Sequence, residues 1–465
     1  MAKKLYDVVV IGAGAAGLAA AEAAASAGAR VCVVESGALG GGHVQAAGLS
    51  SKALLAAARA YRSAHELKPF GVSVGSVSFQ VEDVMKHRDR AVEAYASAVR
   101  FEERLRTQSV DVVRGAAVFE DDQTILVNQE RIEARAFVLA AGAVNALPDI
   151  PGLSQVHVWY WQDVFTKKRL PKSVVILGGG ALGCEIATYY ATFGTRVILL
   201  ESSAQVLLQE DAELGGWAEE RLTHMGVTVV THAHITMIVD GMGGVYGVHV
   251  DVNGTKALHA VEQIVVATGS RACVTGTEEA GLTLDAHGFI SVTKEQQTNK
   301  KHIFAAGGVS SGASVPVHVA RGQGMIAGYN AALTALQKRT KRRASENGAV
   351  PRVVFTDPEC ASVGMTSGAV KARNGNVLIG RASFEHLARA QADRQVYGHV
   401  KLIAHPKTRK LLGGCVTGPS AGELIHVITL AIQTHLTVDR LSELAYAFPT
   451  YTEAITLAAS QLTVE

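Results

Sequence analysis

The stretch "YDVVVIGAGAAGLAAAEAAASAGARVCVVES" occupies residues 6–36 and decides the fold of the first part of the chain. It opens with a β-branched run that is typical of a buried parallel strand. Three glycines in the pattern G-x-G-x-x-G follow, then an alanine-rich segment that predicts a helix, then "RVCVVE", which predicts a second strand. This order indicates a unit of strand, turn, helix and strand that binds a dinucleotide.

Each part of the pattern has a chemical reason. Gly12 makes the tight turn, and Gly14 lets the backbone approach a pyrophosphate at the N-terminus of the helix. Gly17 allows close packing of the helix on the strand, and Glu35 can accept hydrogen bonds from ribose hydroxyls. One glycine pattern alone is a weak signal, but here all five parts occur in order.

The pattern recurs at "SVVILGGGALGCEIATYYATFGTRVILLES", residues 173–202, with Gly178, Gly180 and Gly183 as the glycines and Glu201 as the acid. Both copies place the acid 23 residues after the first glycine. Two such sites imply two dinucleotides, and flavin plus nicotinamide is the economical choice. The sequence therefore predicts an α/β fold with two Rossmann-like domains.

The end of the second copy also predicts which nicotinamide cofactor binds. A carboxylate at this position binds a free 2′-hydroxyl and repels a 2′-phosphate. Ser202 and Ser203 follow Glu201, without an arginine that would hold that phosphate. We therefore expect NAD(P)H binding with NADH favoured over NADPH.

Charge and cysteine usage narrow the class of protein. The net charge of the 465 residues is +2, from 44 basic and 42 acidic side chains, which gives no support for nucleic acid or a membrane surface as a partner. The uncharged run at residues 8–21 is too short to cross a bilayer. The five cysteines lack the spacing of a metal site or of a disulfide framework, so we expect no bound metal and a reduced, cytoplasmic protein.

The segments after residue 350 lack the glycine pattern of the two nucleotide units and predict strands followed by a helix. "HPKTRK", residues 405–410, predicts a turn between paired strands. "AGELIHVITLAIQTHL", residues 421–436, has the spacing of an amphipathic helix with one broad apolar face. This part is expected to be a third domain that forms a dimer interface.

The order of these segments resembles the pyridine nucleotide-disulfide oxidoreductases, the family of dihydrolipoamide dehydrogenase, glutathione reductase and mercuric reductase. The resemblance covers nearly the whole chain, and "VVFTDPECASVG", "AGELIHVITLAI" and "FPTYTEAITLAAS" look closest to the mercuric reductase and dihydrolipoamide dehydrogenase branch. It implies a homodimer with an α+β C-terminal dimerisation domain. The implied domains are FAD-binding at 1–150 and 271–345, NAD(P)-binding at 151–270 and the interface domain at 346–465.

The resemblance also assigns residues to the cofactor sites. The positions that it adds to the two glycine patterns are Gly41, Ala117, Gly142, Gly269 and Gly308. Lys52 in "SSKALL" matches the lysine beside the flavin ring, and Glu185 in "GCEIA" matches its carboxylate partner. A lysine cation there would stabilise charge on the reduced ring.

The chain departs from the family where the redox disulfide should be. Aligning "SSKALL" without gaps places the two thiol positions at His43 and Gly48, and neither residue can form a disulfide. The family's relay from flavin to disulfide to substrate is therefore expected to be absent. His43 is either a group that titrates near neutral pH over the flavin or a polar filler where the thiol stood.

Three further positions differ from the family. Phe448 replaces the histidine of the C-terminal His–Glu pair, Glu453 remains, and Tyr451 or Tyr446 could stand nearby. Gly308 stands where the family has an aspartate that binds the FAD ribityl chain, and losing that hydrogen bond would weaken FAD binding by roughly 10- to 100-fold. Ser270 stands at an arginine position.

Four functions are compatible with these residues. We expect an FAD-dependent NAD(P)H oxidoreductase without a redox disulfide, which passes electrons from flavin directly to a small acceptor such as a quinone, a metal ion, a dye or oxygen. A flavin-mediated transhydrogenase between nicotinamide pools is one alternative. A non-catalytic relative that binds dinucleotide is another, and a true thiol-based reductase is disfavoured.

Overall fold

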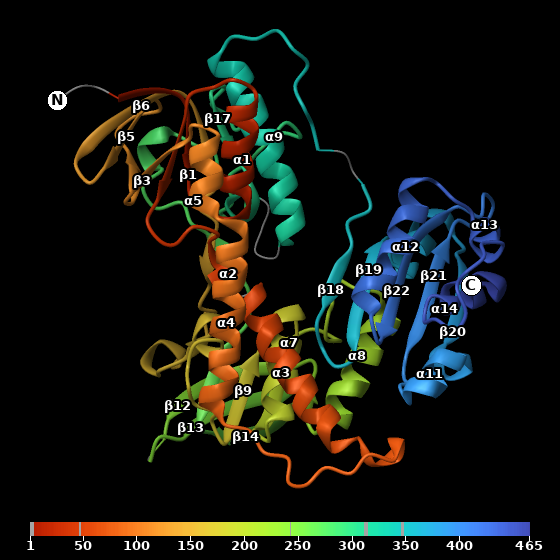
Figure 1. The fold of residues 1–465 in the computed structure, drawn as a ribbon. Helices are drawn as coiled ribbons and strands as arrows, with labels where there is room; N and C mark the ends of the chain where they lie inside the picture. Colours follow the sequence, from red (N-terminus) through yellow and green to blue (C-terminus); the bar gives the residue numbers. More distant parts are fainter. Residues whose placement is uncertain (1–3, 46–47, 242, 311–314, 346–347) are drawn as a thin grey trace. The chain divides into compact units, whose positions relative to one another are not determined.

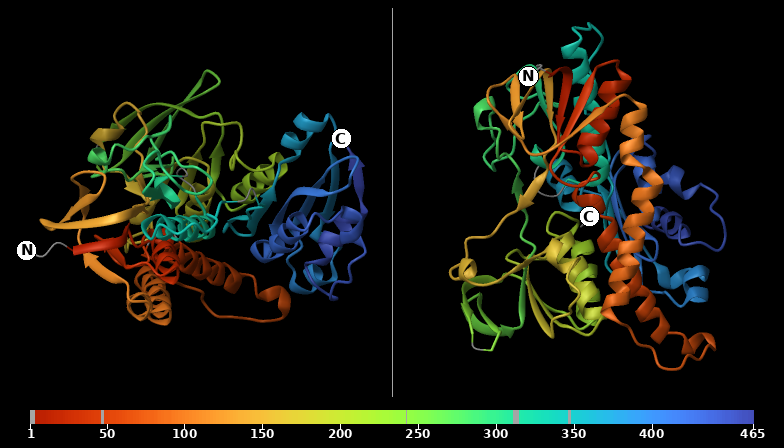
Figure 2. Two further views of the ribbon diagram at one scale, coloured as in Figure 1. Left: turned by 90° about the horizontal axis from the view of Figure 1, so that it is seen from above. Right: turned by 60° about the vertical axis from the view of Figure 1, so that its left-hand side comes forward.

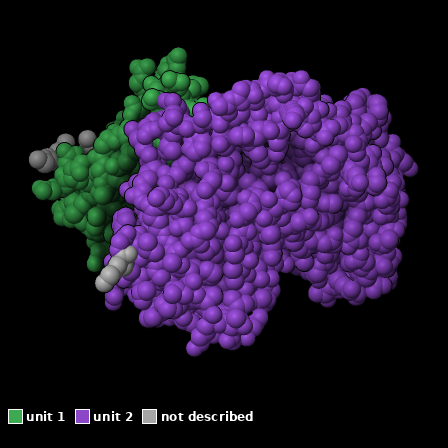
Figure 3. Space-filling view, turned by 90° about the horizontal axis from the view of Figure 1, so that it is seen from below, with its two compact units in different colours: residues 1–53, 85–147, 269–347 green, residues 54–84, 148–268, 348–465 purple. Residues whose placement is uncertain are grey.

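Two units make up the chain (Figure 3): Met1–Ala53, Met85–Leu147 and Gly269–Asn347 form unit 1, and Leu54–Val84, Pro148–Thr268 and Gly348–Glu465 form unit 2. The structure is a computed structural model. It describes residues 4–45, 48–241, 243–310, 315–345 and 348–465, with the backbone alone for Lys4, His43 and Gln45. No helix within these ranges is long and apolar enough to cross a membrane.

Unit 1 contains the first glycine pattern in a mixed sheet of order β3-β2-β1-β6-β5-β4, with β17 also paired to β6. Strands β1, β3, β5, β6 and β17 of this sheet are labelled in Figure 1. Strands β3, β2, β1, β6 and β17 are parallel, whereas β5 and β4 continue antiparallel from the first half of β6. The bounds are β1 Lys4–Ile11, β2 Val31–Glu35, β3 Asp111–Arg114, β4 Ala117–Phe119, β5 Thr124–Val127, β6 Glu130–Leu139 and β17 Ile303–Ala305. The predicted strand, helix and second strand are confirmed.

Helices α1 (Ala15–Ser26) and α9 (Val317–Ala335) lie side by side against this sheet (Figures 1 and 2). Their backbones touch because α9 carries glycine at the contacts. A β-carbon added at Gly324 would lie 2.0 Å from the carbonyl oxygen of Ala16, and one added at Gly328 would lie 2.0 Å from that of Ala20. Helix α9 thereby fixes the position of the helix that follows the first glycine turn.

The segment between β2 and β3 is helical and passes through both units. Its helices are α2 Gly42–Gln45, α3 Leu49–His65, α4 Val81–Val99 and α5 Phe101–Thr107. Residues 54–84 group with unit 2. The ring of Tyr61 stacks on Phe193 at a centroid distance of 5.5 Å, and Phe79 contacts the same ring at 4.6 Å. The functional domain limits given above stay predictions.

The second glycine pattern lies in unit 2 in a parallel sheet of order β11-β10-β9-β15-β8, beside an antiparallel meander of β12, β13 and β14. The strands are β8 Trp159–Tyr160, β9 Ser173–Leu177, β10 Arg196–Leu200, β11 Thr228–Val230, β12 His234–Asp240, β13 Tyr246–Val252, β14 Thr255–Val261 and β15 Gln263–Val266. The helices are α6 Trp161–Val164, α7 Ala181–Thr192 and α8 Ala212–His224. The repeat predicted from the sequence is confirmed, because β9, α7 and β10 are arranged around the second set of glycines as β1, α1 and β2 are around the first.

The C-terminal part of unit 2 is a six-stranded antiparallel sheet of order β18-β19-β22-β21-β20-β23. Its strands are β18 Arg352–Val354, β19 Glu359–Gly364, β20 Leu378–Ser383, β21 His399–Ala404, β22 Leu411–Gly418 and β23 Leu462–Val464. Its helices are α10 Ser367–Asn374, α11 Ala388–Asp393, α12 Ala421–Gln433, α13 Val438–Ser442 and α14 Glu453–Ser460. The predicted turn at 405–410 joins β21 to β22, and the predicted amphipathic helix is α12.

Candidate cofactor sites

The first glycine turn is shaped by contacts that only glycine permits. Gly12 has φ +97°, and a β-carbon there would lie 2.5 Å from the carbonyl oxygen of Ala140. One added at Gly17 would lie 1.8 Å from the carbonyl oxygen of Gly12. A β-carbon at Gly14, in contrast, would meet nothing within 4 Å. The fold itself requires the outer two glycines, while the middle one faces open space that a ligand's phosphates could fill.

The acid at the end of β2 is held by the turn that it accompanies. The carboxylate of Glu35 accepts hydrogen bonds from the backbone N–H groups of Ala13 and Gly37, each at 2.6 Å. These bonds fix its orientation before any ligand arrives. A carboxylate fixed beside a glycine turn is the group that a ribose hydroxyl needs as acceptor.

Further positions assigned to FAD gather at the same edge of the unit 1 sheet. A β-carbon at Gly41 would lie 2.8 Å from the Cα of Gly14, so the segment after β2 touches the glycine turn. A β-carbon at Gly308 would lie 3.3 Å from the carbonyl carbon of Gly142, so the loops after β17 and β6 also meet. The carboxyl ends of parallel strands bring these loops together.

Ala117 and Gly269 lie in unit 1 as well. Ala117 is the first residue of β4, and the preceding Gly115 donates its N–H to the carbonyl of Glu35 at 3.0 Å. The carbonyl of Gly269 accepts from the N–H of Ala146 at 3.2 Å. Strand β4, which starts at Ala117, therefore starts close to the carboxyl end of β2. Gly269 is the first residue of the third stretch of chain in unit 1.

A side chain that sequence reasoning missed supports the turn after β17. The side-chain oxygen of Gln323, on α9, accepts the backbone N–H of Gly307 at 2.9 Å. The turn Gly307–Val309 therefore depends on a helix that lies further along the chain. No sequence pattern near Gln323 indicates this role.

The second glycine turn repeats the geometry of the first. A β-carbon at Gly178, where φ is +105°, would lie 2.8 Å from the carbonyl oxygen of Ala267. One at Gly183 would lie 1.9 Å from the carbonyl oxygen of Gly178, and one at Gly180 would meet nothing within 4 Å. The middle glycine again faces open space, as a second dinucleotide would require.

The acid of the second copy is also held by backbone donors. Glu201 accepts the N–H of Gly179 at 2.7 Å and the N–H of Ser203 at 2.8 Å. The two acids therefore share one arrangement, in which a carboxylate reaches back to the glycine turn. This likeness supports the same kind of ligand, a ribose, at both sites.

Lys52 and Glu185, the residues assigned to the flavin ring, lie in different units. Lys52 is half-buried on α3, and its ammonium donates to the hydroxyl of Ser51 at 3.2 Å. Glu185 is 4% exposed on α7 and accepts the backbone N–H of Phe355 at 3.0 Å. Their pairing stays a prediction.

The other two residues predicted to be catalytic are His43 and Glu453, and the structure gives fewer contacts for them. The backbone of His43 lies in α2, but its side chain is outside the described part of the chain. Glu453 begins α14 and accepts the backbone N–H of Thr450 at 3.0 Å. Tyr451 donates its hydroxyl to Asp393 at 3.0 Å, and burial together with this bond raises its pKa to about 12.

The structure describes all five cysteines, and none of them forms a disulfide. Cys32, Cys184, Cys360 and Cys415 are buried and Cys273 is partly buried. Burial raises the pKa of Cys184, Cys360 and Cys415, which keeps these thiols protonated. The thiolate is the reactive form of cysteine, so these three are poor nucleophiles.

Comparison with known families assigns the chain. A family model described as pyridine nucleotide-disulphide oxidoreductase matches residues 6–324, and the dimerisation domain of the same family matches residues 350–459. The chain belongs to this family. It is thus placed among flavoprotein oxidoreductases that use FAD and a pyridine nucleotide, and the dimerisation domain supports a homodimer.

Individual relatives of this oxidoreductase agree. Mercuric reductase of Staphylococcus aureus is 29% identical over 98% of this chain and 82% of its own length. Dihydrolipoyl dehydrogenases of Chlamydia trachomatis and Chlorobaculum parvum are 30% and 33% identical, covering 96% and 98% of this chain and 95% and 96% of their own lengths. The flavoprotein disulfide reductase RclA of Escherichia coli superposes with a TM-score of 0.85 over 99% of both chains, at 24% identity, which supports the fold.

Gly308 gives a direct test of the FAD site. Its φ is not left-handed, and a β-carbon would lie 3.2 Å from the backbone nitrogen of Ala143, so a side chain fits if that loop shifts slightly. We expect Gly308→Asp to restore the family's hydrogen bond and lower the FAD dissociation constant by about tenfold. Flavin fluorescence titration of the apoprotein measures this. Gly308→Ala adds the β-carbon alone, and equal affinities of the two variants would contradict the prediction.

Proposed function

We propose that this oxidoreductase binds FAD at the first glycine turn and NADH at the second, and passes electrons to a small acceptor without a redox disulfide of its own. The acceptor would be a quinone, a metal ion, a dye or oxygen. Bound FAD would supply a hydride acceptor for NADH and a donor of electrons to the small acceptor. The observation that carries the proposal is that both dinucleotide turns are complete, while residues 33–183 contain no cysteine.

The chain's own residues divide the work of binding and orientation. Gly14 and Gly180 leave room for pyrophosphates at the N-termini of α1 and α7, where backbone N–H groups favour anions. Lys52 would place a positive charge against the flavin ring, which favours its reduced, anionic form. Glu185 is buried and held by the N–H of Phe355, and the family resemblance assigns it as the carboxylate partner of that lysine.

The thiols support direct transfer rather than a relay. A relay needs a pair of exposed cysteines of which one is readily ionised. Cys184, Cys360 and Cys415 are buried, with pKa values raised by that burial. A thiol relay through these residues would require burying a thiolate.

The test is the visible spectrum of the purified protein before and after anaerobic addition of NADH. The proposal expects a flavin band that NADH bleaches within the time of turnover, without a thiolate-to-flavin charge-transfer band. A protein that binds no FAD even when it is added, or whose flavin NADH leaves oxidised, contradicts the proposal. Turnover of lipoamide or glutathione disulfide would show a thiol mechanism instead.

NADH should be preferred to NADPH because of Glu201. We expect flavin bleaching by NADPH to require at least about tenfold more nucleotide, the scale of one unfavourable charge contact. Glu201→Gln should bring the NADPH concentration needed for bleaching closer to that of NADH, because a neutral amide does not repel the 2′-phosphate. Stopped-flow titration with both nucleotides measures it.

The matched control is Glu35→Gln, the same change at the equivalent position of the first copy. It should lower FAD content and leave the ratio of NADH to NADPH affinities unchanged. A changed ratio in Glu35→Gln, or an unchanged ratio in Glu201→Gln, would reverse the assignment of the two sites.

A further inference from the structure

The loop 202–210, between β10 and α8, begins at the acid of the second dinucleotide site. Its first residues are tied to that site, because Glu201 accepts the N–H of Ser203 at 2.8 Å and the carbonyl of Gly179 accepts the N–H of Leu207 at 2.9 Å. Val206 is fully buried. This end of the loop is therefore part of the nucleotide site.

The other end of the loop is tied to the C-terminal sheet. The carboxylate of Glu210 accepts two hydrogen bonds from Arg352 on β18, at 2.7 and 2.8 Å, and a further one from the hydroxyl of Ser362 on β19. The Glu210 side chain is only 9% exposed. Hydrogen bonding to this carboxylate raises the pKa of Arg352, so its guanidinium stays charged.

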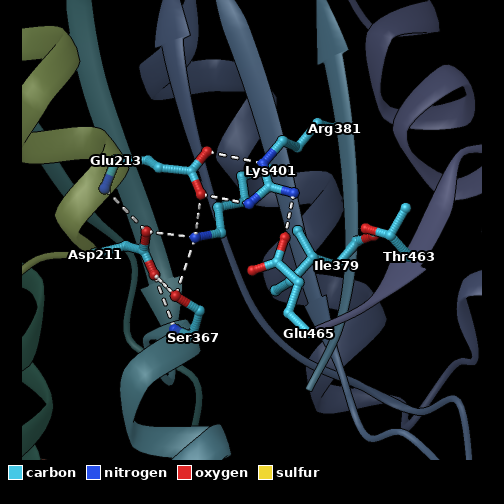
Figure 4. Close-up of polar contacts among 8 residues, drawn as sticks. All are labelled: Asp211, Glu213, Ser367, Ile379, Arg381, Lys401, Thr463 and Glu465. Atoms are coloured by element: carbon cyan, nitrogen blue, oxygen red, sulfur yellow. Dashed lines mark hydrogen bonds and ion pairs between the residues drawn. The ribbon is translucent and has the colours of Figure 1, made fainter. Parts of the chain in front are cut away.

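The next residue adds a second, deeper attachment (Figure 4). The carboxylate of Asp211, at the N-terminus of α8, accepts a hydrogen bond from the ammonium of Lys401 and one from the hydroxyl of Ser367, each at 2.7 Å. Both side chains of the Asp211–Lys401 pair are 3% exposed. Burial opposes ionisation of Asp211, but these hydrogen bonds outweigh it and lower its pKa. Two consecutive residues thus fix the end of the loop to the C-terminal domain.

The contacts continue along α8. Trp217 stacks on His399 of β21 at a centroid distance of 4.9 Å, and Tyr397 donates its hydroxyl to the carbonyl of Trp217 at 3.1 Å. Going along α8 from its N-terminus, the helix contacts first Lys401, then His399 and then Tyr397, which are alternate residues in and just before β21. The helix is therefore held on the C-terminal sheet along its length.

Contacts inside the loop link its two ends. The N–H of Glu210 donates to the carbonyl of Leu207 at 2.8 Å, which links the attached end to the residue that contacts Gly179. A β-carbon at Gly215 would lie 2.8 Å from the carbonyl oxygen of Val206, so the loop also packs directly on α8. Releasing Glu210 would therefore loosen the end of the loop that Leu207 joins to Gly179.

We infer that Arg352 and Lys401 of the C-terminal domain are positioning residues for the pyridine nucleotide, acting through Glu210, Asp211 and the loop 202–210 on Glu201. The inference rests on the proposed function, in that the second site binds NADH. Neither residue needs to touch the nucleotide. The affinity for its adenosine end would be set partly by the domain that also forms the dimer.

The test compares Arg352→Met with wild type by NADH titration and by amide hydrogen exchange. We expect the dissociation constant for NADH to rise roughly 2- to 30-fold, the usual range of coupling between sites, and amides of the loop 202–210 to exchange faster. FAD content and the rate at saturating NADH should stay within about twofold, since the substitution lies outside both turns. Arg352→Lys, which can still reach the Glu210 carboxylate, should restore part of the affinity.

Arg409→Met is the matched control, because Arg409 also makes a bidentate pair in the C-terminal domain, with Asp439 at 2.7 and 2.6 Å, but does not contact the loop. It should leave NADH affinity unchanged. Equal NADH affinity and equal loop exchange in Arg352→Met and wild type would overturn the inference alone. A wild-type protein that binds FAD but no NADH would overturn the proposed function and the inference together.

Discussion

Replacing Lys401 by methionine is expected to lower the free energy of unfolding of unit 2 by about 3–5 kcal/mol. The ammonium lies 2.7 Å from carboxylate oxygens of both Asp211 and Glu213 (Figure 4). Its removal leaves the buried Asp211 carboxylate without a counter-charge, which costs more than the pair contributes. All three tryptophans lie in unit 2, so urea unfolding followed by tryptophan fluorescence measures this unit.

Lys407→Met is the control for the loss of a lysine as such. Lys407 is exposed in the turn between β21 and β22, and its replacement should change stability by no more than about 0.5 kcal/mol.

The pH dependence of the free energy of unfolding gives a second check. Because Lys401 holds the pKa of Asp211 below its usual range, the stability from this pair is present at neutral pH and is lost as pH falls below about 4. Superimposable unfolding curves of Lys401→Met and wild type at neutral pH would contradict the prediction.

Adding one methyl group at Gly17 or Gly183 should weaken one cofactor site and spare the other. The β-carbon would lie 1.8 Å or 1.9 Å from a backbone carbonyl, so the turn must shift, and we expect affinity for the ligand of that turn to fall about 10- to 100-fold. Gly17→Ala should purify with little flavin. Gly183→Ala should remain yellow but resist bleaching by NADH. Absorption spectra and NADH titration separate the two results.

Gly14→Ala and Gly180→Ala are the matched controls. Their methyl groups would meet no protein atom within 4 Å, so thermal unfolding should be unchanged. Any loss of cofactor in these variants then reports the approach of the ligand itself. A colourless Gly183→Ala protein beside a yellow Gly17→Ala protein would show that the two sites are exchanged.

The two nucleotide units could be predicted from the sequence because their signals are local. Each turn places its glycines, helix and acid within about 30 residues, and the same contacts, down to the carboxylate that holds the turn, recur at Glu35 and Glu201. Strand-and-helix order in the C-terminal part was also predictable, since period-2 and period-3.6 patterns are local. Lys52, Glu185, His43 and Glu453 remain predictions that rest on the family resemblance.

The attachment of α8 to the C-terminal sheet could not be predicted. Lys401 stands between Val400 and Leu402 in a strand, and its partner Asp211 is 190 residues away in the chain. A charged residue in such a strand ordinarily indicates a solvent-facing position. Only the arrival of α8 over β21 converts it into a buried ion pair. Gln323 was missed for the same reason, since its contact with Gly307 depends on how α9 packs.

The division of unit 1 into separated stretches of chain has a consequence for its synthesis. Strands β1, β2, β3 and β6 leave the ribosome early, but β17 and α9, which complete the sheet and fix α1, come only after residue 300. The second nucleotide-binding sheet, from β8 to β15, has by then been translated in full. Protein domains generally fold as they emerge. In this chain, the first strands of the N-terminal cofactor site are therefore synthesised before the second nucleotide-binding sheet, but the site can be completed only after that sheet.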